Sequence, residues 1–356
     1  MKPLPLLAEI ERLLIVKTSS LGDVIHALPV AQALQAARPG LTLGWVVRRR
    51  CADILRSNPA IDRLYVMENR PKLGELRRLR RTLRAEDYQM ALDMQGLLLS
   101  GLITGLSGAP VRVGWDRNRE ANALFLTHPI VPGRLSQVGV RHEVDLLCGF
   151  ARALGVNTEL DEFPPQPYLA AEGRDKAEDW LCGLRRPCLA LNIGAARAYK
   201  RWPAEHWVEL GRALAERRCG LVFVGDESDA ALAAGIKAQL PPATNVVDVA
   251  GRTTLRELAA VLAECDLVIS GDTGPMHLAV AVGTPVVALF GATDPRRHGP
   301  YGRRNTVLSD AASVTAGRPM EAEGTAAMRA IAPATVLAAA QARLHDRGPA
   351  IEAAGG

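Results

Sequence analysis

A strand-to-helix turn in the second half of the chain carries the residues of an anion-binding site. It lies in "VISGDTGPMHLAVAVGTPVVALFGATDP", residues 268–295, where an apolar run ends at Ser270 and a helical pattern follows Pro275. Amides exposed at the start of a helix attract anions, and glycines let a phosphate approach the backbone. The polar residues and the glycine of this turn are Asp272, Thr273, Gly274 and His277. Together they favour a bound phosphate, although Asp272 or Thr273 alone can simply cap the helix.

Two further loops point to the same ligand. In "NIGAARAYKRWPAEHW" the chain leaves a strand through Gly194 and presents Lys200, whose ammonium can neutralise a phosphate. In "FVGDESD" another strand ends at Asp226 and Glu227, acids that can accept hydrogen bonds from ribose hydroxyls or a base. An exposed loop lysine and a helix-capping aspartate are the alternatives.

The first half of the chain has a comparable turn in "LLIVKTSSLGDVIHALP", which begins at Leu13. Its four leading apolar residues predict a buried strand, and an apolar segment at helical spacing follows Asp23. The small residues between them are Ser19, Ser20 and Gly22. Exposed amides in this turn can meet a phosphate or a sugar hydroxyl, and Asp23 can cap the helix that follows.

The elements that must position these turns alternate between strand and helix. The predicted strands are Leu13–Val16, Leu41–Val47, Arg63–Val66, Gln89–Asp93, Val111–Val113, Cys188–Ile193, Leu221–Val224, Asn245–Val249, Leu267–Ser270 and Pro285–Phe290. The predicted helices are Val24–Ala37, Leu73–Leu83, Leu97–Leu106, Ala204–Arg217, Asp229–Gln239, Leu255–Glu264 and Met276–Val282. Such alternation is typical of βαβ units and parallel sheets, whose ligands bind beyond the carboxyl ends of the strands. The predicted fold class is α/β, with two doubly wound domains in tandem.

Length and one irregular segment predict the domain boundaries. A chain of 356 residues is too long for one ordinary core, and the proline-containing segment 157–173 has no periodicity and indicates an interdomain linker. We expect an N-terminal domain at 1–165, a C-terminal domain at 166–330, and a C-terminal helix with a frayed tail at 331–356. That helix, Pro333–Leu344, can return to pack on the first domain.

Composition and charge argue against several classes of protein. Apolar residues make up 48% of the chain and the net charge is +5, which is ordinary for a globular protein. The six cysteines form no CxxC pair, so neither a zinc site nor a disulfide framework is indicated. No signal-peptide pattern and no apolar run of membrane-spanning length is present, and we expect a cytoplasmic protein.

One stretch of the first half is strongly basic. Between residues 70 and 84, seven cations stand against the single acid Glu75. Such a cluster can meet phosphates, acidic lipids or nucleic acid, and a solvated helix face is the alternative. No aromatic residues interleave with the cations, which disfavours single-stranded nucleic acid as a partner. The cations are Arg70, Lys72, Arg77, Arg78, Arg80, Arg81 and Arg84.

Taken in order, these motifs resemble those of the lipopolysaccharide heptosyltransferases, glycosyltransferase family 9, and most closely the type I enzymes that add the first heptose to the inner core. The matching stretches are "KTSSLGDVIHALP", "ALDMQGLLLSGLI", "YKRWPAEHW", "DTGPMHLAVAVGTPVVALFGATDP" and "GPYG". The resemblance implies the GT-B architecture, in which two Rossmann-like domains face a central cleft. It also implies an ADP-heptose donor, bound mainly by the C-terminal domain, and inversion without a metal or another cofactor.

The resemblance assigns roles to single residues. Asp23 corresponds to the catalytic aspartate, the general base that takes the proton of the acceptor hydroxyl, and Lys200 to the lysine that neutralises the leaving diphosphate. The expected donor-binding set is Ser19, Ser20, Gly22, Gly194, Lys200, Asp226, Glu227, Asp272, Thr273, Gly274 and His277. The expected acceptor-binding set is Arg70, Lys72, Arg77, Arg78, Arg80, Arg81, Arg119, Glu120 and His142.

Two departures from the family pattern are visible. Ala195 and Ala196 stand where type I enzymes carry hydroxyl residues, and the cysteine-containing segment that type II members carry after "YG" is absent. We expect a monomeric cytoplasmic enzyme that meets an anionic glycolipid, Kdo-lipid A, at the inner face of the inner membrane, without a nucleic-acid partner.

Two alternatives remain open. One is a family 9 enzyme that uses another nucleotide sugar or glycan acceptor. The other is a non-catalytic nucleotide-binding α/β protein. Asp23 disfavours this alternative, because a protein that only binds a nucleotide has no need for an acid that faces its own anionic ligand.

Overall fold

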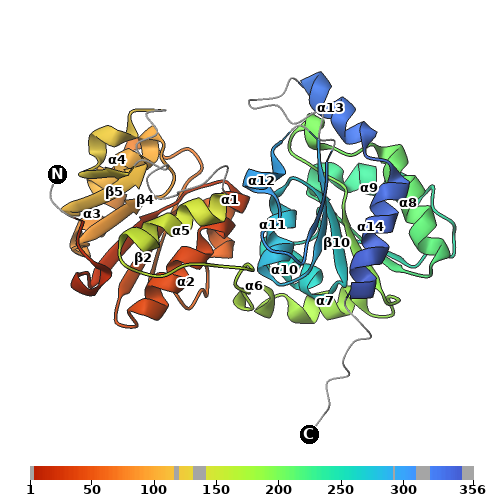
Figure 1. The fold of residues 1–356 in the computed structure, drawn as a ribbon, viewed down its shortest axis with the longest axis horizontal. Coiled ribbons are helices and arrows are strands. Elements are labelled where there is room, and N and C mark those ends of the chain that lie inside the picture. The colour runs from red at the N-terminus through yellow and green to blue at the C-terminus, as the bar shows by residue number, and fades with distance from the viewer. Residues whose placement is uncertain (1–3, 116–119, 131–141, 292, 310–320, 347–356) are drawn as a thin grey trace, which may run out of the picture. The chain divides into compact units, whose positions relative to one another are not determined.

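The computed structural model describes residues 4–115, 120–130, 142–291, 293–309 and 321–346. The chain divides into two compact units, Met1–Leu160 and Asp161–Gly356. Each unit contains a six-stranded sheet in which all neighbouring strands are parallel, and helices cover both faces of the sheet (Figure 1). The predicted α/β class with two doubly wound sheets is confirmed.

The first sheet has the strand order β3-β2-β1-β4-β5-β6. Its strands are β1 (Arg12–Val16), β2 (Thr42–Arg48), β3 (Arg63–Met67), β4 (Met90–Asp93), β5 (Val111–Trp115) and β6 (His128–Ile130). Val16, the last residue of β1, is aligned with Val46 of β2 and with Asp93 of β4. Because the strands are parallel, the loops that follow β1, β2 and β4 emerge side by side at the carboxyl edge of the sheet.

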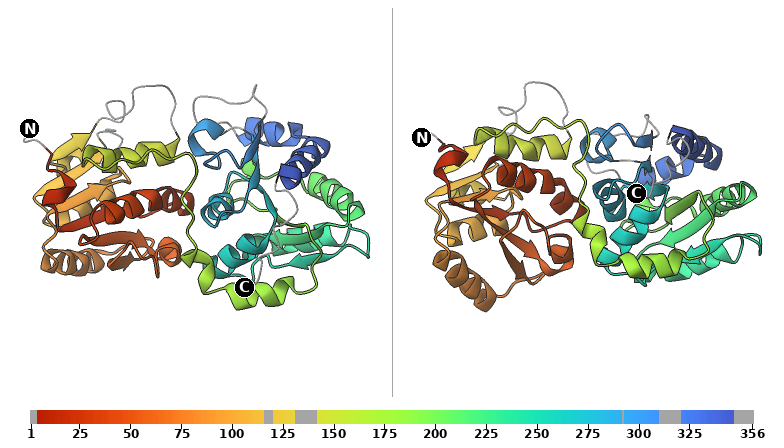
Figure 2. Two further views of the ribbon diagram at one scale, coloured as in Figure 1. Left: turned by 60° about the horizontal axis from the view of Figure 1, so that its bottom comes forward. Right: turned by 90° about the horizontal axis from the view of Figure 1, so that it is seen from below.

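Helices of the first unit form a layer on each face of this sheet (Figure 2). They are η1 (Leu7–Glu9), α1 (Leu21–His26), α2 (Leu28–Ala37), η2 (Arg49–Ile54), α3 (Leu73–Ala85), α4 (Leu98–Leu106), η3 (Asn122–Phe125) and α5 (Glu143–Ala153). Helices α1, α2 and α5 pack together, as do α3 and α4. Leu83 of α3 and Ile103 of α4 share a buried cluster with Leu14 and Val16, which places these two helices on one face of β1.

The first predicted helix, Val24–Ala37, is wrong in its start and in its continuity. The structure has two helices, of which α1 begins three residues earlier, at Leu21, and α2 begins at Leu28. Pro29 lies in the first turn of α2. A proline has no N–H to donate to the preceding turn, so a helix can start at this position but cannot run through it without a break.

The second sheet has the strand order β12-β11-β10-β7-β8-β9. Its strands are β7 (Cys188–Asn192), β8 (Gly220–Val224), β9 (Val246–Asp248), β10 (Leu267–Gly271), β11 (Val286–Phe290) and β12 (Thr306–Ser309). At its centre, Asn192 of β7 is aligned with Ser270 of β10 and Val224 of β8. The loops after these three strands therefore share one edge.

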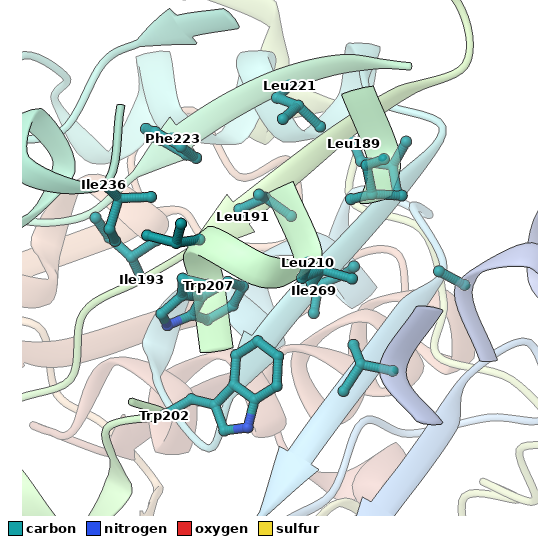
Figure 3. Packing of buried hydrophobic residues seen from close by; sticks show 14 of the residues in the cluster. Leu189, Leu191, Ile193, Trp202, Trp207, Leu210, Leu221, Phe223, Ile236 and Ile269 are labelled. Carbon is teal, nitrogen blue, oxygen red and sulfur yellow. The ribbon is translucent and has the colours of Figure 1, made fainter. Parts of the chain in front are cut away.

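Helices of the second unit include two groups that pack within themselves, α8 with α9 and α14, and α10 with α6, α7 and α11. The elements are α6 (Tyr168–Ala171), α7 (Arg174–Leu181), η5 (Ala198–Lys200), α8 (Ala204–Glu216), η6 (Glu227–Asp229), α9 (Ala230–Lys237), α10 (Leu255–Glu264), α11 (Gly274–Ala281), α12 (Pro295–His298), α13 (Glu321–Ala330) and α14 (Pro333–Asp346). In the core of the second unit, the ring of Trp202 meets that of Trp207 in α8 edge to face, with 4.8 Å between the ring centroids (Figure 3).

The C-terminal helix α14 is built into the core of the second unit, whereas the sequence left open that it returns to the first domain. Val336 and Ala340 of α14 are fully buried in the same cluster as Trp207 and Leu189 of the second unit. The segment 157–173, predicted as a linker, is also partly built into this unit. It contains α6, and the backbone N–H of Gln166 donates to the carbonyl of Ala281 in α11 at 2.8 Å.

Candidate active site

Asp23 lies in the first turn of α1, and its carboxylate is held from two sides. Its Oδ2 accepts hydrogen bonds from the backbone N–H of Ser20, at 2.8 Å, and from the Ser20 hydroxyl, at 2.7 Å. Its Oδ1 lies 3.8 Å from the ammonium of Lys17, and 31% of the Asp23 side chain is exposed. Ser20, not Asp23, occupies the N-cap position, because the helix begins at Leu21. The carboxylate is thus both oriented and reachable from solvent.

Lys17 is a buried cation that directly follows β1. Only 3% of its side chain is exposed, and its ammonium donates to the carbonyl of Met94 at 3.1 Å. A buried ammonium is costly unless it has a charge partner and hydrogen-bond acceptors, which Asp23 and Met94 supply here. Lys17 was not among the site residues expected from the sequence. A charged residue that follows four buried apolar residues was the signal.

A second network holds the same turn from the end of β4. Oε1 of Gln95 accepts hydrogen bonds from the backbone N–H groups of Thr18, at 3.0 Å, and Ser19, at 3.1 Å. The Asp93 carboxylate in turn accepts from the backbone N–H groups of Gln95 and Gly96, at 3.1 and 2.9 Å. Asp93 is fully buried, and burial raises the pKa of its carboxyl. Sequence reasoning missed Gln95, although a polar residue just after a buried strand is a recognisable signal.

Because of these networks, the backbone amides of the Asp23 turn do not have the ligand-binding role that we expected for them. The N–H groups of Thr18 and Ser19 are bound by Gln95, and that of Ser20 by Asp23. They therefore shape the turn instead of presenting donors to a phosphate or sugar. Gly22, in the first turn of α1, is buried beside them.

His142 lies next to the helix that carries Asp23. It is the N-cap of α5, where its Nδ1 accepts from the backbone N–H of Val144 at 3.1 Å. Its ring meets that of buried His26, the last residue of α1, edge to face with 5.2 Å between ring centroids. Capping therefore fixes the His142 ring against α1.

Glu120 lies beside the start of α4. Its Oε2 accepts a hydrogen bond from the backbone N–H of Leu98 at 3.2 Å. Since α4 follows β4, this contact too belongs to the carboxyl edge of the first sheet. Arg119, the expected partner of Glu120, lies outside the described residues.

The basic stretch forms the loop before α3 and the exposed face of that helix. Its buried side consists of Leu76, Leu79 and Leu83. The exposed arginines of the helix are Arg77, Arg78, Arg80, Arg81 and Arg84. Helix α3 follows the carboxyl end of β3 and leads to the start of β4, so it runs away from the edge where Asp23 lies. Arg70 and Lys72, which precede the helix, lie at that edge, whereas Arg84 lies near the opposite one.

In the second unit, Lys200 and Asp272 form an ion pair. The Lys200 ammonium lies 2.6 Å from Oδ2 of Asp272, and the two side chains are 24% and 10% exposed. The pair joins η5 to the loop that follows β10, which are the two loops in which the sequence places a phosphate site. Lys200 is therefore a largely buried, paired cation and not an exposed loop residue.

Thr273 is the N-cap of α11, yet its side chain makes no capping hydrogen bond. Its Oγ1 instead accepts from Nδ2 of Asn192 at 2.7 Å, and the same amide group donates to Oγ of Ser270 at 2.9 Å. Helix α11 begins at Gly274 without a side-chain cap from Thr273, which suits an anion at its N-terminus. His277, in the first turn of α11, is only 7% exposed. Sequence reasoning missed Asn192, a polar residue that ends a buried strand.

Gly194 shapes the site by its lack of a side chain. A Cβ atom at this position would lie 1.8 Å from Oδ2 of Asp229, so only glycine fits. Asp229 is buried, which raises the pKa of its carboxyl, and it pairs with Arg201 at 3.1 Å. Gly194 thus makes room for a structural ion pair beside the Lys200 loop.

Asp226 caps η6, which is the alternative to ligand binding that its sequence position allowed. Its Oδ1 accepts from the backbone N–H of Ser228 at 2.8 Å and from the Ser228 hydroxyl at 2.6 Å. These bonds from Ser228 lower the pKa of the Asp226 carboxyl. Both acids are exposed, but Ser228 already occupies Oδ1 of Asp226, which leaves Glu227 better placed to accept a hydrogen bond from a ligand.

Helix α13, which the sequence pattern does not predict, braces the Lys200 loop. A Cβ atom at Gly324 of α13 would lie 2.8 Å from Cβ of Tyr199, so the helix packs closely against η5. Trp202, two residues after Lys200, donates its indole N–H to the carbonyl of Ile331 at 2.9 Å. The Ala- and Gly-rich sequence of this helix gave no periodic signal.

Among the described residues, no group of three or more His, Cys, Asp or Glu side chains is arranged to hold a metal ion. In the same part of the chain, no helix combines the length and the apolar character that crossing a membrane requires.

Comparisons with known proteins agree on one family. The profile of glycosyltransferase family 9 (heptosyltransferase) matches residues 76–323. Lipopolysaccharide heptosyltransferase 1 of Pseudomonas aeruginosa is 33% identical over 83% of this chain and 83% of its own length. The enzyme of that name from Escherichia coli K12 is 32% identical over 83% of this chain and 92% of its own. The structure of E. coli heptosyltransferase WaaC with ADP-2-deoxy-2-fluoro heptose superimposes with a TM-score of 0.72 at 26% identity, covering 93% of this chain and 99% of that one.

Proposed function

The chain belongs to glycosyltransferase family 9, the heptosyltransferases, and on that basis we propose that it transfers heptose from ADP-heptose to the Kdo-lipid A inner core of lipopolysaccharide. Identity above 30% to two type I enzymes, across most of the chain, supports the inner-core acceptor. The likeness to a structure that contains an ADP-heptose analogue supports the donor.

Asp23 is the proposed general base. In an inverting transfer the acceptor hydroxyl attacks the anomeric carbon and loses its proton in the same step, which requires a positioned carboxylate. Ser20 occupies Oδ2 of Asp23 with two hydrogen bonds, and Lys17 faces Oδ1 from 3.8 Å. These contacts fix the carboxylate while leaving it partly exposed. Their geometry is the observation that carries the proposal.

The second unit is the proposed site of the diphosphate. The Lys200 ammonium and the N-terminus of α11 bring positive charge to one sheet edge, where they stabilise the charge that develops on the leaving ADP. We propose that this charge replaces a metal ion in the reaction. Asp272 keeps the ammonium aimed at the start of α11 before the donor binds.

On the acceptor side, we propose that the basic stretch around α3 meets the phosphates and carboxylates of Kdo-lipid A. The exposed guanidinium groups of α3 suit bidentate contacts with such anions. Glu120 and His142 complete the acceptor side as proposed, each already held by a backbone contact. The enzyme acts as a monomer that associates peripherally with the inner face of the inner membrane, where its glycolipid acceptor lies.

A transfer assay tests this function. Purified protein is incubated with Kdo-lipid A and one nucleotide sugar in each of four parallel reactions. The nucleotide sugars are ADP-heptose, UDP-glucose, GDP-mannose and ADP-glucose, and the product masses are measured by mass spectrometry. We expect one added heptose with ADP-heptose and no product with the other nucleotide sugars. Transfer from another nucleotide sugar alone would reassign the donor within the family. Binding of ADP without transfer from any donor would indicate a non-catalytic protein.

A further inference from the structure

Three consecutive arginines follow β2 beside the Asp23 turn. Arg48 ends the strand, and Arg49 and Arg50 begin η2. Strand β2 is the parallel neighbour of β1, and the backbone N–H of Arg48 donates to the carbonyl of Thr18 at 3.1 Å. Helix α1, which carries Asp23, packs against η2. The arginines therefore stand one strand away from Asp23 at the same edge.

The three arginines differ in whether a carboxylate neutralises their charge. The Arg49 guanidinium donates twice to Oε1 of Glu68, at 3.0 and 2.5 Å. Among the described residues, no carboxylate forms an ion pair with Arg48 or Arg50, and the buried Nε of Arg48 has no hydrogen-bond partner there. An unsatisfied buried donor on a charged group is costly, and an anionic ligand would remove that cost.

The Cys51 thiol shows that these groups share one neighbourhood. Burial raises the pKa of this thiol. The charges of Arg50 and Arg48 oppose that rise in pKa, whereas the Asp23 carboxylate adds to it. Lys17 lies on the other side of Asp23. Two arginines, the Asp23 carboxylate and its partner Lys17 therefore lie within electrostatic reach of the same thiol or of one another.

We propose that Arg48 and Arg50 form a subsite for an anionic group, a carboxylate or a phosphate, that the acceptor carries close to the hydroxyl that is glycosylated. This inference rests on the proposed function, because it places the anion beside the general base. The subsite holds the acceptor at the carboxyl end of β2, the strand next to β1, whereas α3 packs on one face of the sheet. It selects acceptors whose reacting sugar is itself anionic or is directly phosphorylated.

The test compares Arg48→Gln, Arg50→Gln and the double variant with Arg49→Gln. Arg49 is the matched control, because it carries the same charge and lies between the two, but its guanidinium is already bound to Glu68. The apparent KM for Kdo-lipid A should rise about tenfold or more in each of the first two variants, since a hydrogen bond to a charged group is lost. In Arg49→Gln it should change by no more than about twofold, as is usual for an exposed ion pair. The KM for ADP-heptose should stay constant in all four.

Modified acceptors identify the anion. Kdo-lipid A with its carboxylates converted to methyl esters and Kdo-lipid A without its phosphates are assayed with wild type and the double variant. The acceptor that lacks the recognised group should show a raised wild-type KM and no further penalty in the double variant.

Three outcomes separate the possibilities. A double variant with an unchanged KM for Kdo-lipid A would overturn the subsite, as would an equal loss in Arg49→Gln. Absence of transfer by the wild type would instead overturn the proposed function. If partly buried Arg48 does not tolerate glutamine, Arg50→Gln at its exposed position still decides the question.

Discussion

The ammonium of Lys17 lies 3.8 Å from Oδ1 of Asp23, and only 3% of the Lys17 side chain is exposed. A buried cation of this kind acts on its partner with little screening by water. Because Ser20 holds the other carboxylate oxygen, the Asp23 side chain is constrained at both atoms.

Gln95 is predicted to position the turn that carries Asp23. Gln95→Leu removes the acceptor of the Thr18 and Ser19 amides, and kcat should fall by about one to two orders of magnitude, because small displacements of a catalytic group are costly. Gln95→Glu keeps an oxygen at that place and should restore most of kcat. Steady-state kinetics and ADP titration check this. A Gln95→Leu enzyme with normal kcat and only a lower melting temperature would reduce Gln95 to a structural residue.

Lys200 is predicted to bind and stabilise the diphosphate. Lys200→Met should lower kcat by about two to three orders of magnitude, the cost of losing one preorganised charge donor, and should weaken ADP binding. Lys176→Met is the matched control, because Lys176 also belongs to the second unit and forms an ion pair, with Glu257. Calorimetric ADP titrations and thermal melts are run on both. Equal ADP affinity in wild type and Lys200→Met would argue against this role.

The exposed arginines of α3 are predicted to attract the acceptor. Replacing Arg77, Arg78, Arg80 and Arg81 with Gln should raise the acceptor KM and leave the donor KM unchanged. The wild-type acceptor KM should itself rise with salt, since the Debye length is about 8 Å at physiological ionic strength. Arg84→Gln, at the far end of the same helix, is the control. If the quadruple variant keeps its acceptor KM at low salt, the stretch is a solvated helix face.

Activity is predicted to survive chelation. Lys200 and the start of α11 supply positive charge to the diphosphate, so EDTA should not change the initial rate. The assay uses protein dialysed against chelator, with magnesium and manganese added back separately. Loss of turnover on chelation and its recovery with either ion would contradict the charge assignment.

The strands were predictable because parallel strands buried on both faces are continuous apolar runs, as in Leu13–Val16 and Val286–Phe290. The short edge strands β6 and β12 were not, since neither is fully buried and β6 contains Pro129. Helix α13 was missed because its Ala- and Gly-rich sequence has no apolar periodicity, and its close packing against Tyr199 depends on the absence of a side chain at Gly324.

For the candidate site, the polar residues at strand-to-helix turns were visible in the sequence, whereas the groups that hold them were not. Gln95 reaches Thr18 across 77 positions, and Asn192 reaches Thr273 across 81. Such pairs follow from the order of strands in the sheet, which local periodicity does not encode. The same holds for Arg48 and Arg50, which come beside Asp23 only because β2 pairs with β1.

The general-base role of Asp23 is tested by comparing Asp23→Asn with wild type in heptose transfer from ADP-heptose to Kdo-lipid A. Asparagine preserves the shape of the side chain but cannot take a proton from the acceptor. We expect kcat to fall by about two to four orders of magnitude, the range for a positioned general base, while the Kd for ADP stays unchanged. Turnover close to that of the wild type, in a variant that binds ADP normally, would contradict this role.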